Sequence, residues 1–348
     1  MKILPIAQYG YGYNNNNYKS KTAAKQKSNN NPSFTSIFAD AKPENEKVYA
    51  LYTVTNPEFN ELKSSSTRIF RELPAEYAIA KLLNQDKKTT IKVLGSSDGS
   101  EAYAYAIALK EVFKDKKASE NVKITAVEKK YPLTELAKTG RIVCSDIEKD
   151  YAVQNEKIQG KSPLAGKGWD SYLIKSQRPK EFTKLLEKYP YLYFMENDPV
   201  AGKSIGNGLD WYEVNKEGLP EIKFETGDMR DYFTSDDEAE QEVYVVANSA
   251  AYLIENKSDP DEYCAMFEKI YNENKGKNKD VYIVTGNVEH KLTNPNYSSP
   301  VGISRKTQQA IEKRIRNSGF KNVSEFKLRK KGIVSYKEAA LKIYKMEN

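Results

Sequence analysis

Short apolar runs alternate with segments of helical periodicity along most of this chain, and this alternation constrains the fold more than any other feature. The apolar runs cover residues 91–96, 122–128, 222–228, 242–249 and 280–287. After the first run, apolar residues from Ala102 to Phe113 recur at helical spacing, which predicts a helix over 100–114. Strands that alternate with helices form parallel sheets with helices on both faces. The sequence therefore predicts an α/β fold with a doubly wound, mostly parallel sheet.

The remaining periodic segments complete this architecture. Further helices are expected at 132–140, 178–189 and 259–271, and one more between a capping Ser304 and a terminating Gly319. Residues 321–340 resemble two strands around a Lys-Lys-Gly turn. We therefore expect a C-terminal antiparallel hairpin at or near one edge of the sheet.

The composition divides the chain into a tail and one domain. Residues 1–45 are rich in Asn, Tyr, Lys and Ser and lack apolar periodicity, so we expect a disordered low-complexity tail. Residues 46–348 are long enough for one large α/β domain. Around residues 150–220 the alternation breaks down, apart from the helix at 178–189, and the stretch GKSIGNGLDW suggests loops or an insertion.

The charge is distributed unevenly. The formal net charge is +7 over 348 residues. Residues 1–31 hold five lysines and no acid, and residues 305–331 hold ten Lys or Arg against Glu312 and Glu325. The middle of the chain is therefore acidic. The basic balance of the whole chain is a weak argument for nucleic acid, because the excess lies at the two ends.

The rare residue types exclude several classes of site. With His290 as the one histidine, a multi-histidine metal centre is impossible, and no metal site is expected. Cys144 and Cys264 are too few for a disulfide framework and suit a reducing compartment. No secretion signal and no apolar stretch of about 20 residues is present, so we expect a soluble cytoplasmic protein without a membrane span. The acidic run at 236–238 is expected to be a solvated loop.

Polar residues follow the predicted strands at their carboxyl ends, where ligands bind in doubly wound sheets. The first strand opens into a loop with Gly95, Ser97, Gly99 and Glu101, and a helix N-terminus there favours a carboxylate or phosphate. The second strand ends at Glu128, which could bind the two hydroxyls of a ribose. Asp228 and Met229 follow the third strand, and Asn248 follows the fourth. This series suits an adenosine-containing ligand, although turn glycines alone are equally compatible with a purely structural loop.

These residues give the chain a resemblance to the CheR-type S-adenosylmethionine-dependent methyltransferases, which esterify glutamates of chemotaxis receptors. That family carries N-x-T-x-F-F-R-E ahead of the first strand, and residues 65–72 here are SSTRIFRE. Its loop S-T-G-E-E-P-Y-S corresponds to SDGSEAYA at 97–104. Its A-S-D-I-D, followed by A-R-x-G, resembles AVEKK at 126–130 followed by AKTG at 137–140.

Two further motifs extend the resemblance over about residues 62–290. The family's Asn-Leu after the third strand falls on Asp228-Met229, and its C-R-N-V-x-I-Y-F falls on VANSAAYL at 246–253. The resemblance implies S-adenosyl-L-methionine as cofactor, with Glu101 facing its amino group and Glu128 its ribose. The cofactor-binding residues implied by the resemblance are Thr67, Arg71, Glu101, Glu128, Asp228, Met229 and Asn248, and the loop residues Gly95, Ser97 and Gly99 complete the expected set. Arg71 and Tyr252 are implied as catalytic residues near the transferred methyl group.

A methyltransferase of this kind is compatible with a single histidine. Methyl transfer is an in-line displacement, so positioning the acceptor matters more than proton transfer. A carboxylate acceptor is already ionised near pH 7, and Arg71 could hold it in bidentate geometry. The sequence therefore predicts a methyltransferase that modifies a protein side chain, by resemblance a carboxylate.

Two alternatives remain open. Ala247 replaces the arginine of the fourth-strand motif, and Lys129-Lys130 replace the residues after the ribose acid. Both departures suggest a catalytically degenerate methyltransferase fold that serves as a binding or scaffold protein. The last alternative is an RNA methyltransferase that uses the basic segment 305–331 as a phosphate contact, but no aromatic-interleaved RNA-binding motif supports it.

Overall fold

The structure of the protein is a computed structural model. It describes Ile69 and residues 73–113, 117–145, 172–189, 192–198, 203–246, 261–286, 305–323 and 341–347. The expected N-terminal tail therefore lies outside the described residues.

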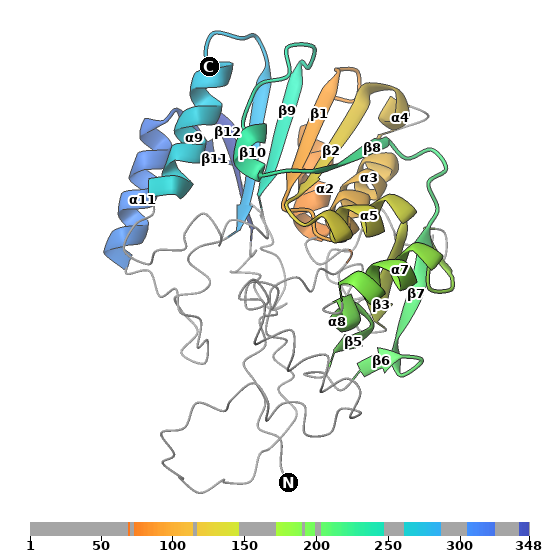
Figure 1. The fold of residues 1–348 in the computed structure, drawn as a ribbon. Coiled ribbons are helices and arrows are strands. Elements are labelled where there is room, and N and C mark those ends of the chain that lie inside the picture. Colours follow the sequence, from red (N-terminus) through yellow and green to blue (C-terminus); the bar gives the residue numbers. More distant parts are fainter. Residues whose placement is uncertain are drawn as a thin grey trace, which may run out of the picture.

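A seven-stranded sheet forms the centre of the molecule (Figure 1). Its strands run in the order β11-β12-β10-β9-β1-β2-β8. The five predicted strands are β1 (Thr89–Leu94), β2 (Val122–Glu128), β8 (Glu221–Thr226), β9 (Gln241–Val246) and β10 (Asp280–Gly286), and each pairs in parallel with its neighbours among them. The predicted doubly wound, mostly parallel sheet is confirmed.

The C-terminal antiparallel hairpin is also confirmed, but its second strand lies later than expected. β11 (Phe320–Asn322) pairs antiparallel with β12 (Leu341–Met346), which also pairs antiparallel with β10. Ile343, Tyr344 and Met346 of β12 are buried, and this apolar burial holds the strand against the sheet. The predicted Lys-Lys-Gly turn lies outside the described residues.

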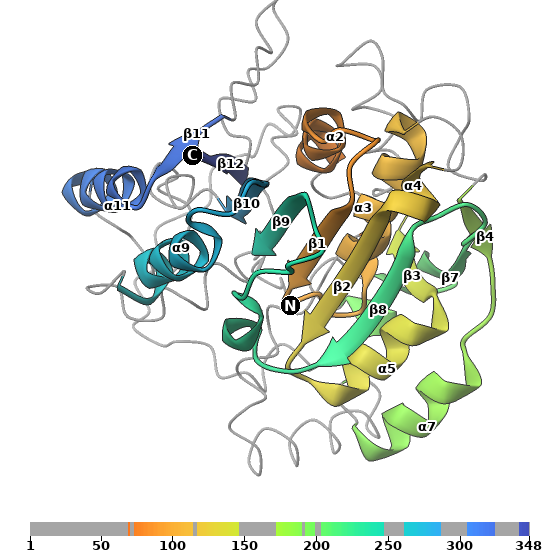
Figure 2. The same cartoon turned by 90° about the horizontal axis from the view of Figure 1, so that it is seen from above.

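Helices cover both faces of this sheet (Figure 2). One face packs against α2 (Leu73–Leu82), α3 (Ser100–Val112), α4 (Lys117–Asn121) and α5 (Tyr131–Thr139). The other face packs against α9 (Asp261–Asn274) and α11 (Arg305–Asn317). The central strands are covered on both faces, so every residue of β1 and β9 is buried, without alternation between buried and exposed positions.

A smaller sheet lies beside α5 in Figure 1, between α5 and β8 in the chain. It contains β3 (Arg141–Ser145), β4 (Leu173–Lys175), β5 (Asn197–Asp198), β6 (Lys203–Ile205) and β7 (Gly208–Val214), with α7 (Lys180–Lys188) and α8 (Tyr193–Glu196) next to them. The stretch GKSIGNGLDW, expected to form loops or an insertion, carries β6 and most of β7. Leu209, Trp211, Tyr212 and Val214 of β7 are buried, and this burial holds the strand in place.

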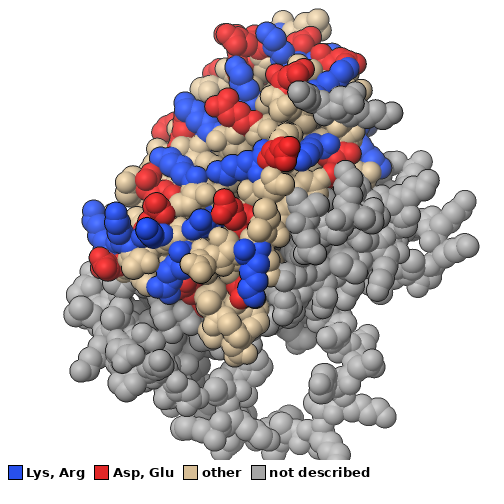
Figure 3. Space-filling view, turned by 90° about the vertical axis from the view of Figure 1, so that its right-hand side faces the viewer, with Lys and Arg blue, Asp and Glu red and all other residues tan. Residues whose placement is uncertain are grey.

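The surface mixes both charge signs. On the face seen in Figure 3, Lys and Arg side chains are interspersed with Asp and Glu over the described residues. No helix among the described residues is both long and apolar enough to cross a membrane.

Candidate functional site

The loop after β1 turns tightly over the end of β2. The backbone amides of Gly95 and Ser96 both donate to the Val127 carbonyl, at 2.8 and 2.9 Å. Gly95 and Gly99 have φ of 79° and 85°, and Ser97 has φ of 51°. Left-handed backbone of this kind favours glycine, which explains two of the residues that the sequence places here.

Gly99 allows the loop to lie directly against neighbouring elements. A Cβ atom built on Gly99 would be 2.9 Å from the Ala137 Cβ of α5 and 2.9 Å from the Phe224 Cε1 of β8. A side chain at this position would therefore push α3 away from both. The start of α3 therefore lies directly against α5 and β8.

Glu128 ends β2 and binds the loop directly. Its Oε2 accepts a hydrogen bond from the Ser97 amide at 2.9 Å, and its Oε1 accepts one from the Lys130 amide at 3.0 Å. Burial raises the pKa of Glu128, and the backbone donors partly offset this rise. Each carboxylate oxygen has further lone-pair capacity. Glu128 can therefore accept two more hydroxyl donors, as the predicted ribose role requires.

Buried polar side chains gather around the start of α3. Asp98 accepts a hydrogen bond from the Ser100 amide at 3.0 Å, and Glu101 is 4% exposed. The Ser96 and Ser100 hydroxyls are buried without a hydrogen-bond partner among the described residues. Buried hydroxyls without partners are uncommon in native proteins and require an explanation such as a bound ligand or water. We did not expect these two serines to be site residues, although both lie in the predicted loop.

The end of β8 adjoins the same point. The Gly227 amide donates to the Glu128 carbonyl at 3.1 Å, which places the following residues next to the β2 end. Asp228 caps the short helix η5 (Met229–Tyr232) by accepting from the Arg230 amide at 3.0 Å. The Asp228 carboxylate also lies 3.6 Å from the Arg230 guanidinium. Met229 packs against the cluster beneath α9, with part of its side chain accessible.

The structure thus brings together the loop after β1, Glu128, and the turn that holds Asp228 and Met229. The other predicted cofactor and catalytic residues, Thr67, Arg71, Asn248 and Tyr252, lie outside the described residues, as do His290 and Ala247. Among the described residues, no group of three or more potential metal ligands occurs.

The comparisons with known proteins concern the fold. No protein-family model matches the chain, and no curated protein matches it in sequence. The chain is similar in structure to a mitomycin 7-O-methyltransferase, with a TM-score of 0.36 and 11% identity over 86% of this chain and 60% of that protein. The chain therefore spans less than two thirds of that enzyme.

Two further similar structures are S-adenosylmethionine-dependent methyltransferases. One, from Leishmania major, shares 11% identity over 86% of this chain and 77% of its own, with a TM-score of 0.36. The other, from Aquifex aeolicus, shares 11% identity over 83% of this chain and 97% of its own, with a TM-score of 0.36.

The order and direction of the strands define the fold. Counted along the chain, the large sheet has the order 3-2-1-4-5-7-6, and its last strand, β12, runs antiparallel to both neighbours. This is the class I methyltransferase fold, a Rossmann-like architecture, as predicted.

Proposed function

We propose that the protein is an S-adenosyl-L-methionine-dependent methyltransferase. One observation carries the proposal: the Glu128 carboxylate bonds the loop after β1 while keeping acceptor capacity, at the carboxyl edge of a class I methyltransferase sheet. A carboxylate at the second strand end is the group that a ribose diol requires.

The neighbouring residues suit the rest of the cofactor. The amides at the start of α3 and the unpartnered Ser96 and Ser100 hydroxyls could bind the carboxylate of its methionine part. Glu101, buried nearby, would face the ammonium group by resemblance. With the ribose at Glu128, the adenine would extend toward the next strand end, where Met229 offers an apolar contact.

The acceptor we propose is a protein carboxylate, as in the CheR-type family that the sequence resembles. The bound cofactor supplies a methyl group on a sulfonium, and its transfer to a carboxylate oxygen breaks the sulfur–carbon bond and leaves the electron pair on sulfur. Arg71 would hold the acceptor, and Tyr252 would lie near the methyl group. Because the acceptor is already ionised, none of these residues needs to remove a proton.

The chemistry of the product provides the test. Purified protein is incubated with methyl-labelled S-adenosyl-L-methionine and cytoplasmic proteins, and the labelled protein fraction is then treated with mild base. A methyl ester releases the label as volatile methanol, whereas an N-methyl group retains it. Base-stable label in protein would refute a carboxylate as the acceptor, but it would still support methyl transfer to protein.

The alternatives predict different outcomes of the same assay. Cofactor binding without transfer to any acceptor would favour the scaffold protein. Label in RNA would favour the RNA methyltransferase, but the structure weakens this alternative: Arg314 of the basic segment is paired with Asp261 and with Glu268, at 3.1 Å from the latter. Part of that segment is therefore neutralised.

A further inference from the structure

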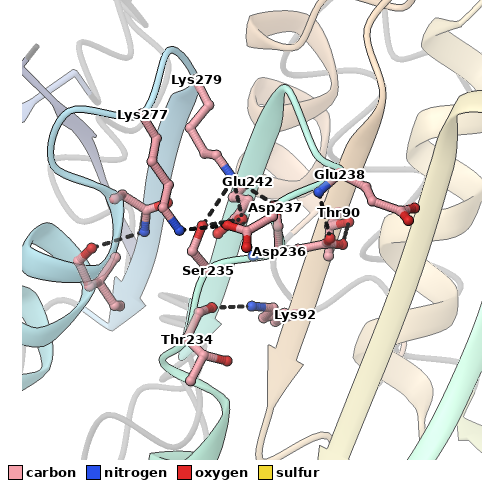
Figure 4. A network of polar contacts seen from close by, with 12 residues as sticks. Thr90, Lys92, Thr234, Ser235, Asp236, Asp237, Glu238, Glu242, Lys277 and Lys279 are labelled. Carbon is pink, nitrogen blue, oxygen red and sulfur yellow. Dashed lines mark hydrogen bonds and ion pairs between the residues drawn. The ribbon is translucent and has the colours of Figure 1, made fainter.

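Two nearly buried lysines, one within β1 and one just before β10, reach the same connection between β8 and β9 (Figure 4). Lys92 of β1 is 7% exposed and Lys279, just before β10, is 6% exposed. Glu242 of β9 is fully buried and accepts from Lys279 at 3.0 Å. Lysine is almost never buried unless it is paired, so the partners of these two side chains are expected to have a specific role. We call Lys92, Lys279 and Glu242 the buried lysine cluster.

The cluster binds one segment of backbone, residues 234–236. Lys92 donates to the Thr234 carbonyl, and the Tyr244 hydroxyl donates to the same oxygen at 2.7 Å. Lys279 donates to the Asp236 carbonyl at 2.6 Å, and the Asp236 amide donates to Glu242 at 2.5 Å. Figure 4 shows Lys92 of β1, Glu242 of β9 and Lys279, just before β10, converging on this connection.

The prediction that the acidic run at 236–238 is a solvated loop is therefore partly wrong. The Asp236 side chain accepts from the Thr90 hydroxyl at 2.7 Å and is partly buried. Asp237 and Glu238 are exposed, as expected.

The architecture explains why this segment needs outside donors. The connection from β8 to β9 spans residues 227–240 and contains only the single turn η5, where a doubly wound fold commonly has a covering helix. A helix would satisfy its own carbonyls, but an irregular segment packed on a sheet must find donors elsewhere. Lys92, Tyr244 and Lys279 supply them.

The same connection carries the turn next to Glu128. Tyr232 follows Arg230 by two residues, and its ring lies 3.0 Å from where a Cβ atom on Gly227 would be. Phe233 is buried in the cluster that includes Tyr244. Thr234 follows at once, so the buried lysine cluster fixes one end of the segment and Gly227 the other.

We propose that Lys92, Lys279 and Glu242 are positioning residues for the cofactor: they hold residues 234–236 on the sheet and thereby set the Asp228–Met229 turn against the adenosine. This proposal rests on the proposed function. It differs from a purely stabilising role in one respect, because it predicts a change in cofactor affinity in protein that remains folded.

The test compares Lys92→Met and the milder Thr90→Val with Lys277→Met as a matched control. Lys277 pairs with Asp237 of the same connection at 2.7 Å, but Lys277 is only partly buried and Asp237 is exposed. Two quantities are measured at a temperature where every variant is folded: amide hydrogen exchange over residues 227–240 without ligand, and calorimetric Kd values for S-adenosyl-L-homocysteine and for adenosine.

We expect Lys92→Met to speed amide exchange over 227–240 and to raise the Kd of both ligands by about tenfold. A rise of this size is expected when only about a tenth of the molecules hold the turn in place. Both ligands should weaken equally, because the adenosine carries the contacts with this turn. Thr90→Val should act in the same direction, and Lys277→Met should stay within about twofold of wild type.

Unchanged affinities in folded Lys92→Met would overturn the proposal, whether or not exchange over 227–240 becomes faster. If Lys92→Met does not fold, the same result in Thr90→Val overturns it. A failure of the proposed function is distinguishable, since the wild-type protein would then bind neither ligand.

Discussion

Replacing Gly99 with alanine tests how closely the loop after β1 must pack. At φ of 85°, an alanine pays about 1–2 kcal/mol for left-handed backbone. Its Cβ would also lie 2.9 Å from Ala137 and from Phe224, closer than such atoms can approach. Overpacking of this kind costs about 1–3 kcal/mol. We therefore expect Gly99→Ala to lower the free energy of unfolding by about 2–5 kcal/mol, measured by urea denaturation.

Gly206→Ala is the matched control for this prediction. Gly206 has φ of 79°, and nothing lies within 4 Å of the place where its Cβ would be. Only the backbone term, about 1–2 kcal/mol, should remain. The difference between the two variants measures the steric contact alone. Equal losses in both would refute the close packing of the loop against α5 and β8.

Three further predictions concern single side chains. Glu128→Ala should weaken S-adenosyl-L-homocysteine by about 100-fold in calorimetry, since two hydrogen bonds to a charged acceptor contribute about 3 kcal/mol; unchanged affinity would remove Glu128 from the site. Arg178→Met should cost about 2 kcal/mol in urea denaturation, because it leaves the buried Glu196, which accepts from Arg178 Nε at 2.7 Å, without its cation; a neutral substitution would contradict this role. Burial alone raises the pKa of Asp280, but hydrogen bonds from Lys345 and Lys87 bring this pKa below its usual value. The advantage of wild type over Asp280→Asn, up to about 1 kcal/mol, should therefore be present above about pH 4 and disappear as the pH falls through the lowered pKa; a difference that persists in acid would contradict the assignment.

The local signals in the sequence predicted the central part of the fold and placed several candidate site residues at one edge of it. Gly95 follows a buried strand and Gly99 precedes a helix, and each signal lies within a few residues of the element it defines. Glu128 follows from the same logic, because the end of a parallel strand falls at a known edge of the sheet. The parallel strands share that edge, so one-dimensional spacing was sufficient to bring these residues together.

Features that depend on contacts distant in sequence were not predicted. Asp236 looked like part of a solvated acidic loop because its partner, Thr90, lies 146 residues away. The strands around residues 203–214 were missed because glycines and polar residues interrupt them, and burial of Trp211 against Phe182 holds β7 in place. Lys92 gave a visible signal, a lysine inside an apolar strand, but its role needs the β8–β9 connection to be interpreted.

The most direct test of the central claim is a calorimetric titration of the full-length protein with S-adenosyl-L-homocysteine, paired with a thermal melt. A cofactor site at the carboxyl edge of the sheet predicts saturable binding of one equivalent and a higher melting temperature with ligand, because a ligand that binds only the folded state stabilises it. Folded protein that releases no heat and shows no thermal shift would contradict both the cofactor site and the methyltransferase function.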